Sequence, residues 1–203
     1  FKKNPTRTAL SALLVSLLLV ACGDKPEDMI SSAKDYLAKN DSKAAVIQIK
    51  NALQKNPDLP EARYLLGKAL MESGDAPGAE TELRKALALN HPQDQVIPPL
   101  ANALLAQGQA KKITDEFVKT TLTDKTAQGV FLTALATAYA MQGQNDAAQS
   151  TLDAALAATP DYAPARLIQA RQKGAQRDFD GALAITEDVI TKTPKSLEAW
   201  KFK

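Results

Sequence analysis

The feature that most constrains the fold is a residue pattern that returns every 34 residues along the chain. When copies are counted from Pro26, the eighth place always holds a small residue, and the twentieth holds alanine in four copies. These residues are Ala33, Gly67, Ala101, Ala136 and Ala170 at the eighth place, and Ala45, Ala79, Ala148 and Ala182 at the twentieth. A unit of this length buries its apolar faces mainly against neighbouring units, so we expect an elongated stack of copies.

Turn-forming residues recur at fixed offsets within the copies. Glycine suits the turn between two helices because it adopts a left-handed backbone easily. Aspartate caps the helix that follows, and proline ends the second helix. These residues are the glycines Gly74, Gly108 and Gly143, the aspartates Asp41, Asp75 and Asp178, and the prolines Pro57, Pro160 and Pro194. Each copy is therefore predicted to be a helix–turn–helix pair.

The composition agrees with an all-α fold, because alanine and leucine dominate while aromatic residues make up only 5%. The third copy is irregular and needs one extra residue. Pro98 and Pro99 fall inside its first helix, which should start late or kink, and Lys125 stands where proline is usual. The expected helix pairs are 27–39/42–55, 61–73/76–89, 95–107/110–121, 128–142/145–158 and 163–176/179–192.

These offsets resemble those of the tetratricopeptide repeat. Leu66-Gly67 and Trp200 stand where its 34-residue consensus has Leu-Gly and tryptophan. The resemblance implies a right-handed superhelix of helix pairs, an α-solenoid, over residues 27–203. It would hold about five repeats and the start of a sixth at Leu197, so we expect the sequence to be the N-terminal part of a longer protein.

The N-terminal residues 1–21 have the pattern of a signal peptide. Lys2, Lys3 and Arg7 precede an apolar stretch, Ala9 to Val20, of about a dozen residues. A transmembrane helix needs about 20 residues, so this stretch is too short to span a bilayer.

The residues Leu19-Val20-Ala21-Cys22 resemble the bacterial lipobox. That resemblance implies a diacylglyceryl group on the sulfur of Cys22, cleavage before it, and a lipid-anchored tether over 22–26. Two or more acyl chains on one residue make a stable membrane anchor. Cys22 is also the only cysteine, and lipidation would account for a lone thiol in an exported protein. The alternative is an ordinary signal peptide with an incidental cysteine. Gly23, rather than aspartate, follows it, which favours the periplasmic face of a Gram-negative outer membrane.

Three stretches resemble the tetratricopeptide-repeat lipoproteins of PEP-CTERM/exosortase systems. They are Ser32–Pro57, Glu61–Leu70 and Leu104–Gln109. Membership would imply a role in exopolysaccharide production and in the sorting of PEP-CTERM proteins.

The sequence offers no catalytic motif, and we expect neither an enzyme nor a cofactor. It lacks a phosphate-binding loop, a dinucleotide fingerprint, H-E-x-x-H and G-x-S-x-G. His91, the one histidine, is predicted in a loop and cannot form a metal site alone. Without Lys2, Lys3 and Arg7 the chain has 22 basic residues against 23 acidic ones, which gives no general case for nucleic acid.

The tetratricopeptide resemblance places first-helix side chains on a concave face. The ninth place holds Lys34, Lys68, Asn102, Thr137 and Arg171, and the fifth holds Ile30, Tyr64, Pro98, Thr133 and Leu167. A mostly basic, polar row is thus expected beside a more apolar one. We take Lys34, Tyr64, Lys68, Asn102 and Arg171 as the candidate binding face, for proteins, extended peptides or an acidic polysaccharide, against the alternative of an ordinary solvated surface.

Three functions remain open from the sequence. The first is a periplasmic scaffold lipoprotein of polysaccharide export and protein sorting. The second is an assembly lipoprotein of an outer-membrane machine, such as a pilotin. The third is the tetratricopeptide arm of an enzyme whose catalytic domain follows residue 203.

Overall fold

The computed structural model describes residues 25–203, and this part contains eleven helices and no strand. The helices are α1 Pro26–Ala38, α2 Ser42–Lys55, α3 Pro60–Glu72, α4 Ala76–Ala88, α5 Gln93–Ala106, α6 Ala110–Phe117, α7 Lys125–Met141, α8 Asn145–Ala158, α9 Ala163–Ala175, α10 Phe179–Lys192 and α11 Leu197–Phe202. No helix in the described range is both long and apolar enough to cross a membrane. The all-α prediction is confirmed.

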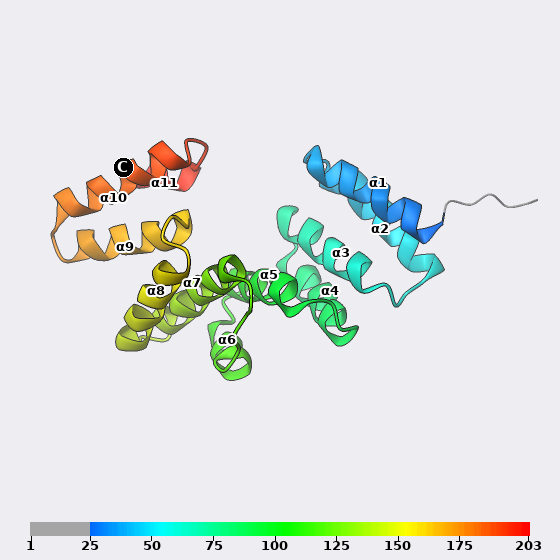
Figure 1. The fold of residues 1–203 in the computed structure, drawn as a ribbon, viewed down its shortest axis with the longest axis horizontal. Coiled ribbons are helices and arrows are strands. Elements are labelled where there is room, and N and C mark those ends of the chain that lie inside the picture. Colours follow the sequence, from blue (N-terminus) through cyan, green and yellow to red (C-terminus); the bar gives the residue numbers. More distant parts are fainter. Residues whose placement is uncertain (1–24) are drawn as a thin grey trace, which may run out of the picture.

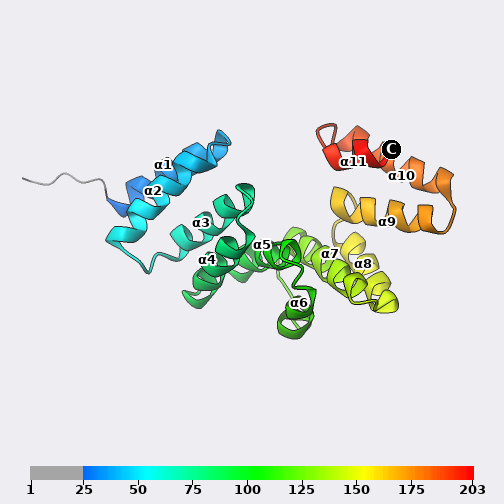
Figure 2. The ribbon, with the colours of Figure 1, turned by 180° about the vertical axis from the view of Figure 1, so that it is seen from behind.

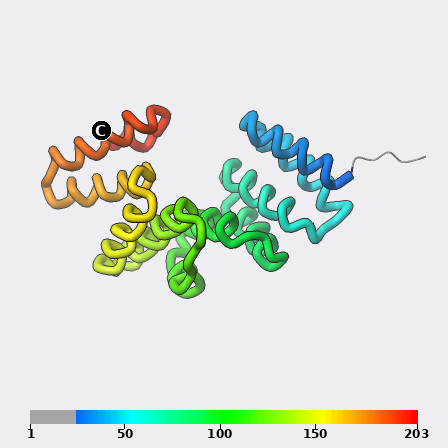
Figure 3. Tube along the Cα trace, viewed as in Figure 1, coloured from blue at the N-terminus to red at the C-terminus, as the bar shows by residue number. Residues whose placement is uncertain are grey.

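The helices stack in chain order into an open arch. Figure 1 shows α1 and α2 at one end, α9 to α11 at the other, and α5 to α7 between them. The view from behind in Figure 2 and the tube in Figure 3 show the same curved succession of pairs. Most contacts between helices join neighbours in the sequence. This is the α-solenoid arrangement expected from a 34-residue repeat.

The turn residues act as predicted. Gly74, Gly108 and Gly143 have φ of 83°, 71° and 73°, in the left-handed region that glycine tolerates best. Each capping aspartate accepts a backbone N–H three residues ahead: Asp41 from Ala44, Asp75 from Gly78 and Asp178 from Gly181. These caps explain why the second helices begin where the sequence predicts.

The small residues of the eighth and twentieth places bring paired helices together. All nine are buried. At Gly67, a Cβ would lie only 2.6 Å from Cγ of Leu83 in the facing helix α4. The small side chain is therefore a requirement of the close approach of α3 and α4.

The third repeat corrects the sequence expectation. Helix α5 begins early, at Gln93, and runs through Pro98 and Pro99. Pro98 and Pro99 are the sixth and seventh residues of α5, so they remove two amides that would bond to the carbonyls of residues 94 and 95. The helix persists because the residues around them are buried in the core. The late start expected from these prolines was wrong.

The second helix of the third repeat is shorter than predicted. Helix α6 ends at Phe117 instead of residue 121, and α7 begins at Lys125 instead of 128. The Asp94 carboxylate accepts hydrogen bonds from the Thr123 hydroxyl and from the amides of Thr123 and Asp124. These bonds hold the connecting segment against the start of α5, and Leu122 within it is buried.

Candidate functional site

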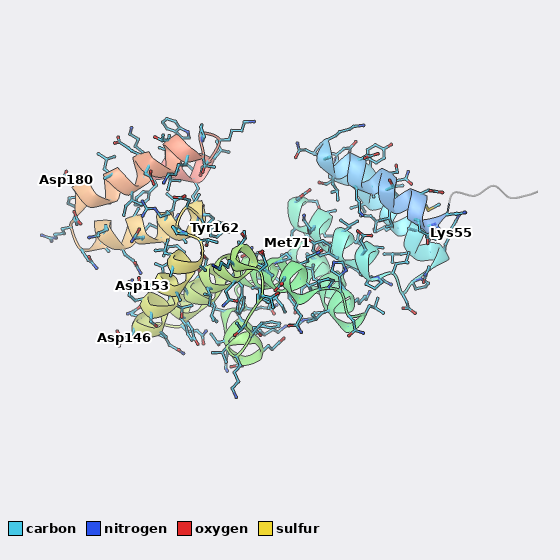
Figure 4. All side chains as sticks on the ribbon, in the orientation of Figure 1. Lys55, Met71, Asp146, Asp153, Tyr162 and Asp180 are labelled. Atoms are coloured by element: carbon cyan, nitrogen blue, oxygen red, sulfur yellow. The ribbon has the colours of Figure 1, made fainter. Side chains whose placement is uncertain are left out.

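The first helices of the repeats line the inner side of the arch. In Figure 4, Met71 at the end of α3 and Tyr162 before α9 lie toward the inside, whereas Asp146, Asp153 and Asp180 lie at the outer edge. The ninth-place residues Lys34, Lys68, Asn102 and Arg171 are exposed, and Thr137 is half-buried. The candidate binding row is therefore open to solvent along most of its length.

Two cations of this row already have partners within the chain. Lys34 Nζ lies 2.6 Å from Glu61 Oε1, and Arg171 Nη2 donates to Glu198 Oε1 at 2.5 Å. In both pairs the acid occupies the second place of the following repeat. Both pairs are about half exposed, so each contributes little stability. Their main effect is to neutralise the two ends of the row.

Lys68 has a different environment, beside an aromatic pair. The rings of Tyr64 and His91 stack with centroids 4.7 Å apart, and Lys68 Nζ lies 5.6 Å from the centre of the Tyr64 ring. His91 Nε2 lies 3.0 Å from Gln95 Oε1. Within residues 25–203 Lys68 has no ion-pair partner. These residues form a cationic and aromatic platform between α3 and α5.

A cavity of about 260 Å³ continues this surface toward the C-terminal repeats. It is lined by Asn102, Leu105, Val130, Thr133, Ala134, Thr137, Tyr162, Pro164, Ile168, Arg171 and Glu198. Most of the lining is apolar, and the Thr137 hydroxyl is occupied as a donor to the Thr133 carbonyl. The Asn102 side chain makes no hydrogen bond to any described residue. Its amide is free to donate to, and accept from, a ligand.

Burial and the negative charge of Glu198 both raise the pKa of Tyr162 above its ordinary value. Its hydroxyl therefore stays protonated across the physiological range and can act as a hydrogen-bond donor in the cavity. The arrangement is suited to binding, because the lining combines apolar side chains with a few neutral polar groups and the paired charges of Arg171 and Glu198.

The fifth-place row differs from the expectation of an apolar surface. Ile30, Pro98, Thr133 and Leu167 are buried, and only Tyr64 is partly exposed. The fifth and eighth places are three residues apart, so they share the helix face that packs inside the array. The fifth place is therefore part of the core and not a second surface row.

Two further sites were predicted from the sequence, a loop histidine and a lipidated cysteine. His91 does lie in the loop after α4, and no group of three or more potential metal ligands occurs in the described part of the chain. The signal peptide and Cys22 lie outside the described residues, so lipidation remains a prediction.

Sequence reasoning missed the carboxylates that face the row. Glu61 follows Lys34, and Glu198 follows Arg171, by the same interval of 27 residues. That interval joins the ninth place of one repeat to the second place of the next. A search for opposite charges at this interval would have found both pairs.

Comparison with known proteins agrees with this architecture. Two family models, both described as tetratricopeptide repeat, match residues 36–98 and 133–196. No curated protein sequence matches the chain.

Solved structures show the same fold at low sequence identity. PilW, described as a widely conserved type IV pilus biogenesis factor, has a TM-score of 0.68 and 18% identity, covering 87% of this chain and 84% of its own. A thermophilic tetratricopeptide protein of Thermus thermophilus has a TM-score of 0.64 and 20% identity over 87% and 96%. YrrB, described as having an unusual peptide-binding site, has a TM-score of 0.54 and 20% identity over 85% and 89%. The repeat pattern, the stacked helix pairs and the family matches together assign this chain to the tetratricopeptide-repeat proteins.

Proposed function

We propose that this protein is a lipid-anchored periplasmic scaffold, without catalytic activity, that holds an extended segment of a partner protein along the inner side of its arch. The observation that carries the proposal is the cavity between α5, α7 and α9, with the free Asn102 amide at its edge. Tetratricopeptide-repeat proteins bind proteins or peptides, which agrees with such a surface.

The charges of the row favour a peptide over an acidic polymer. An anionic polymer would need several cations at once, since each exposed pair contributes only about 0.2–1 kcal/mol. It would have to displace Glu61 from Lys34 and Glu198 from Arg171. A peptide strand needs no such exchange, because its backbone pairs with the Asn102 amide and an aliphatic side chain fills the cavity.

We assign the scaffold to exopolysaccharide export and the sorting of PEP-CTERM proteins. The support is the resemblance of Ser32–Pro57, Glu61–Leu70 and Leu104–Gln109 to lipoproteins of those systems. Deleting the gene should leave PEP-CTERM proteins unsorted and reduce surface polysaccharide. Normal sorting and normal polysaccharide in the deletion strain would contradict this assignment.

The groove is tested by site-specific photo-crosslinking in living cells. A photoreactive residue replacing Asn102 should crosslink a PEP-CTERM protein, whereas one replacing Ser150, on the outer surface of α8, should not. A second change, Ile168→Asp, places a charge in the cavity and should abolish the Asn102 crosslink. Equal crosslinking from both positions would refute the groove as the binding site.

The anchor is tested by Cys22→Ser, which removes the thiol that would carry the lipid. The variant should remain unprocessed or leave the membrane fraction. Normal processing and membrane fractionation of this variant would show that Cys22 is not the anchor.

A second candidate function is assembly of a type IV pilus, which the structural similarity to PilW favours. That similarity, at 18% identity, shows the fold alone. Loss of pili and of twitching motility in the deletion strain, with PEP-CTERM sorting intact, would support this alternative over the sorting role.

A further inference from the structure

The outward face of the second helices changes its charge from one end of the array to the other. In α2 three successive outward places hold Lys43, Ile47 and Lys50, all exposed. The same places in α8 hold Asp146, Ser150 and Asp153, also exposed. The outer surface is therefore basic at the N-terminal repeat and acidic toward the C-terminal repeats, as Figure 4 shows for Asp146, Asp153 and Asp180 at the outer edge.

Two lysines of α2, Lys43 and Lys50, differ from those of the other second helices in lacking carboxylate partners among the described residues. Helix α2 contains no aspartate or glutamate, and neither Lys43 nor Lys50 forms an ion pair within residues 25–203. By contrast, Lys85 of α4 lies 2.8 Å from Glu82, and Lys192 of α10 lies 2.7 Å from Asp161. The positive charge of Lys43 and Lys50 is thus available to an external anion.

Ile47 stands between the two lysines with 59% of its surface exposed. The equivalent outward places hold polar or small residues: Thr81 in α4, Ser150 in α8 and Ala184 in α10. A large apolar side chain framed by unpaired lysines is the combination that binds a lipid interface, where the charges meet headgroups and the apolar group enters the acyl boundary.

The short chain between Cys22 and α1 limits how far the first repeat can lie from a lipid on Cys22. Three residues separate Cys22 from Pro26, the first residue of α1, so four chain steps of at most about 14 Å in total join the two. Helix α2 runs back alongside α1, so its end lies near the start of α1. A lipid on Cys22 would hold the first repeat within reach of the headgroups.

We propose that the α2 surface (Lys43, Ile47 and Lys50) rests on anionic phospholipid headgroups and orients the arch on the membrane. The proposal rests on the lipid anchor of the proposed function. Each lysine near an anionic bilayer strengthens binding about fivefold, so the pair contributes about 25-fold. The aspartates of α8 are repelled by the same surface, which keeps the C-terminal repeats and the inner groove away from the lipid.

The test places a fluorophore on the lipidated protein in vesicles that contain a quencher in the acyl region. Cys22 is the only cysteine and carries the lipid, so a new cysteine labels selectively. Gln54→Cys puts the label on the same face of α2, and Ala157→Cys puts it at the equivalent place of α8; both positions are exposed. With phosphatidylglycerol in the vesicles, quenching at position 54 should exceed that at 157 several-fold, and salt should reduce it.

Two charge-reversed variants complete the test. Lys43→Glu with Lys50→Glu should abolish the quenching at position 54 while the protein still floats with the vesicles. Lys119→Glu with Lys195→Glu makes the same change in net charge elsewhere on the surface and should leave the quenching intact. Equal quenching at positions 54 and 157, or quenching that survives in the α2 variant or on pure phosphatidylcholine, would overturn the proposal.

Failure of the anchor is separately visible, because an unlipidated protein would not float in high salt. In that case the α2 surface is tested at low salt by the affinity of the unlipidated protein for vesicles, measured by flotation. The α2 variant should lower this affinity about 25-fold, and the control should not. Unchanged flotation of the α2 variant would overturn the proposal there too. Self-association that both the α2 variant and Asp146→Lys remove would instead identify a second copy as the partner.

Discussion

The close approach of α3 and α4 makes a quantitative prediction at Gly67. An added Cβ would lie 2.6 Å from Leu83 Cγ and 3.3 Å from the Ala79 carbonyl oxygen. Leu83 is fully buried, and its Cγ is a branch point, so the clash cannot be relieved by turning a side-chain tip. Gly67→Ala gains about 1 kcal/mol of helix propensity but incurs about 1–3 kcal/mol of overpacking. We expect a net loss of about 1 kcal/mol.

The second change removes the side chain that causes the clash. Leu83→Ala should lower the free energy of unfolding by about 2–5 kcal/mol, because it leaves a cavity. In that background the new methyl group of Gly67→Ala enters the vacated space. It should then stabilise the protein by about 1 kcal/mol, so its effect changes sign. The coupling between the two sites is therefore about 2 kcal/mol, far above the error expected for independent sites.

The assay must be local, since repeat arrays need not unfold as one cooperative unit. Amide hydrogen exchange of α3 and α4, followed by mass spectrometry, reports the stability of this repeat, and urea unfolding followed by circular dichroism reports the whole array. Gly174→Ala is the matched control, because a Cβ there meets no atom within 4 Å. It should stabilise α9 by about 1 kcal/mol. The reasoning fails if Gly67→Ala stabilises as much as Gly174→Ala, or if the Gly67 and Leu83 effects are additive.

The cap of α4, the ion pairs of Glu82 and the exposed helix α11 each allow a further test. Asp75→Ala removes the cap of α4 and should cost about 1 kcal/mol in urea unfolding, whereas Asp75→Asn should retain most of the cap; equal losses would contradict this. Burial alone would raise the pKa of Glu82, but hydrogen bonds from Lys85 and Arg63 outweigh it and hold the pKa below its usual value. Because the folded pKa is lowered, this carboxylate stabilises the fold above the unfolded pKa of about 4.3, and the contribution disappears as pH falls through the folded value. Glu82→Gln should therefore make the free energy of unfolding depend less on pH between about pH 5 and about pH 3, and an unchanged pH profile would contradict it. Helix α11, with Trp200 53% exposed, should exchange its amides faster than α9, and equal protection of the two would refute this.

Most of the fold could be predicted from the sequence because the repeat constrains it several times over. Small residues at the eighth and twentieth places, glycine at the turn and aspartate at the cap each mark the same boundaries. Every predicted helix pair exists, and outside the third repeat and the start of α7 the ends differ by one residue at most. Where independent local signals agree, local preference and tertiary packing favour the same conformation.

The third repeat was mispredicted because its signals conflict. Pro98 and Pro99 indicated a late helix start, but α5 is buried in the core, and that packing outweighs the loss of two backbone hydrogen bonds. The segment that replaces the predicted end of α6 is held by Asp94, which lies 29 residues before Thr123 in the sequence. No local sequence pattern indicates a contact over this distance, so it could not be predicted from the sequence.

The candidate row is exposed as expected, but its charge differs from the sequence expectation, and the reason lies in how repeats meet. The ninth place of one repeat faces the second place of the next, so the charge offered to a ligand depends on both. Lys34 and Arg171 face glutamates and are neutralised. For Lys68 the same interval leads to Gln95, which is uncharged, so Lys68 stays without an ion-pair partner among the described residues and lies beside the Tyr64–His91 pair. A binding row in such an array is therefore encoded by pairs of places 27 residues apart. By that rule, the groove of this protein presents its positive charge at the second repeat and a neutral surface from Asn102 onward.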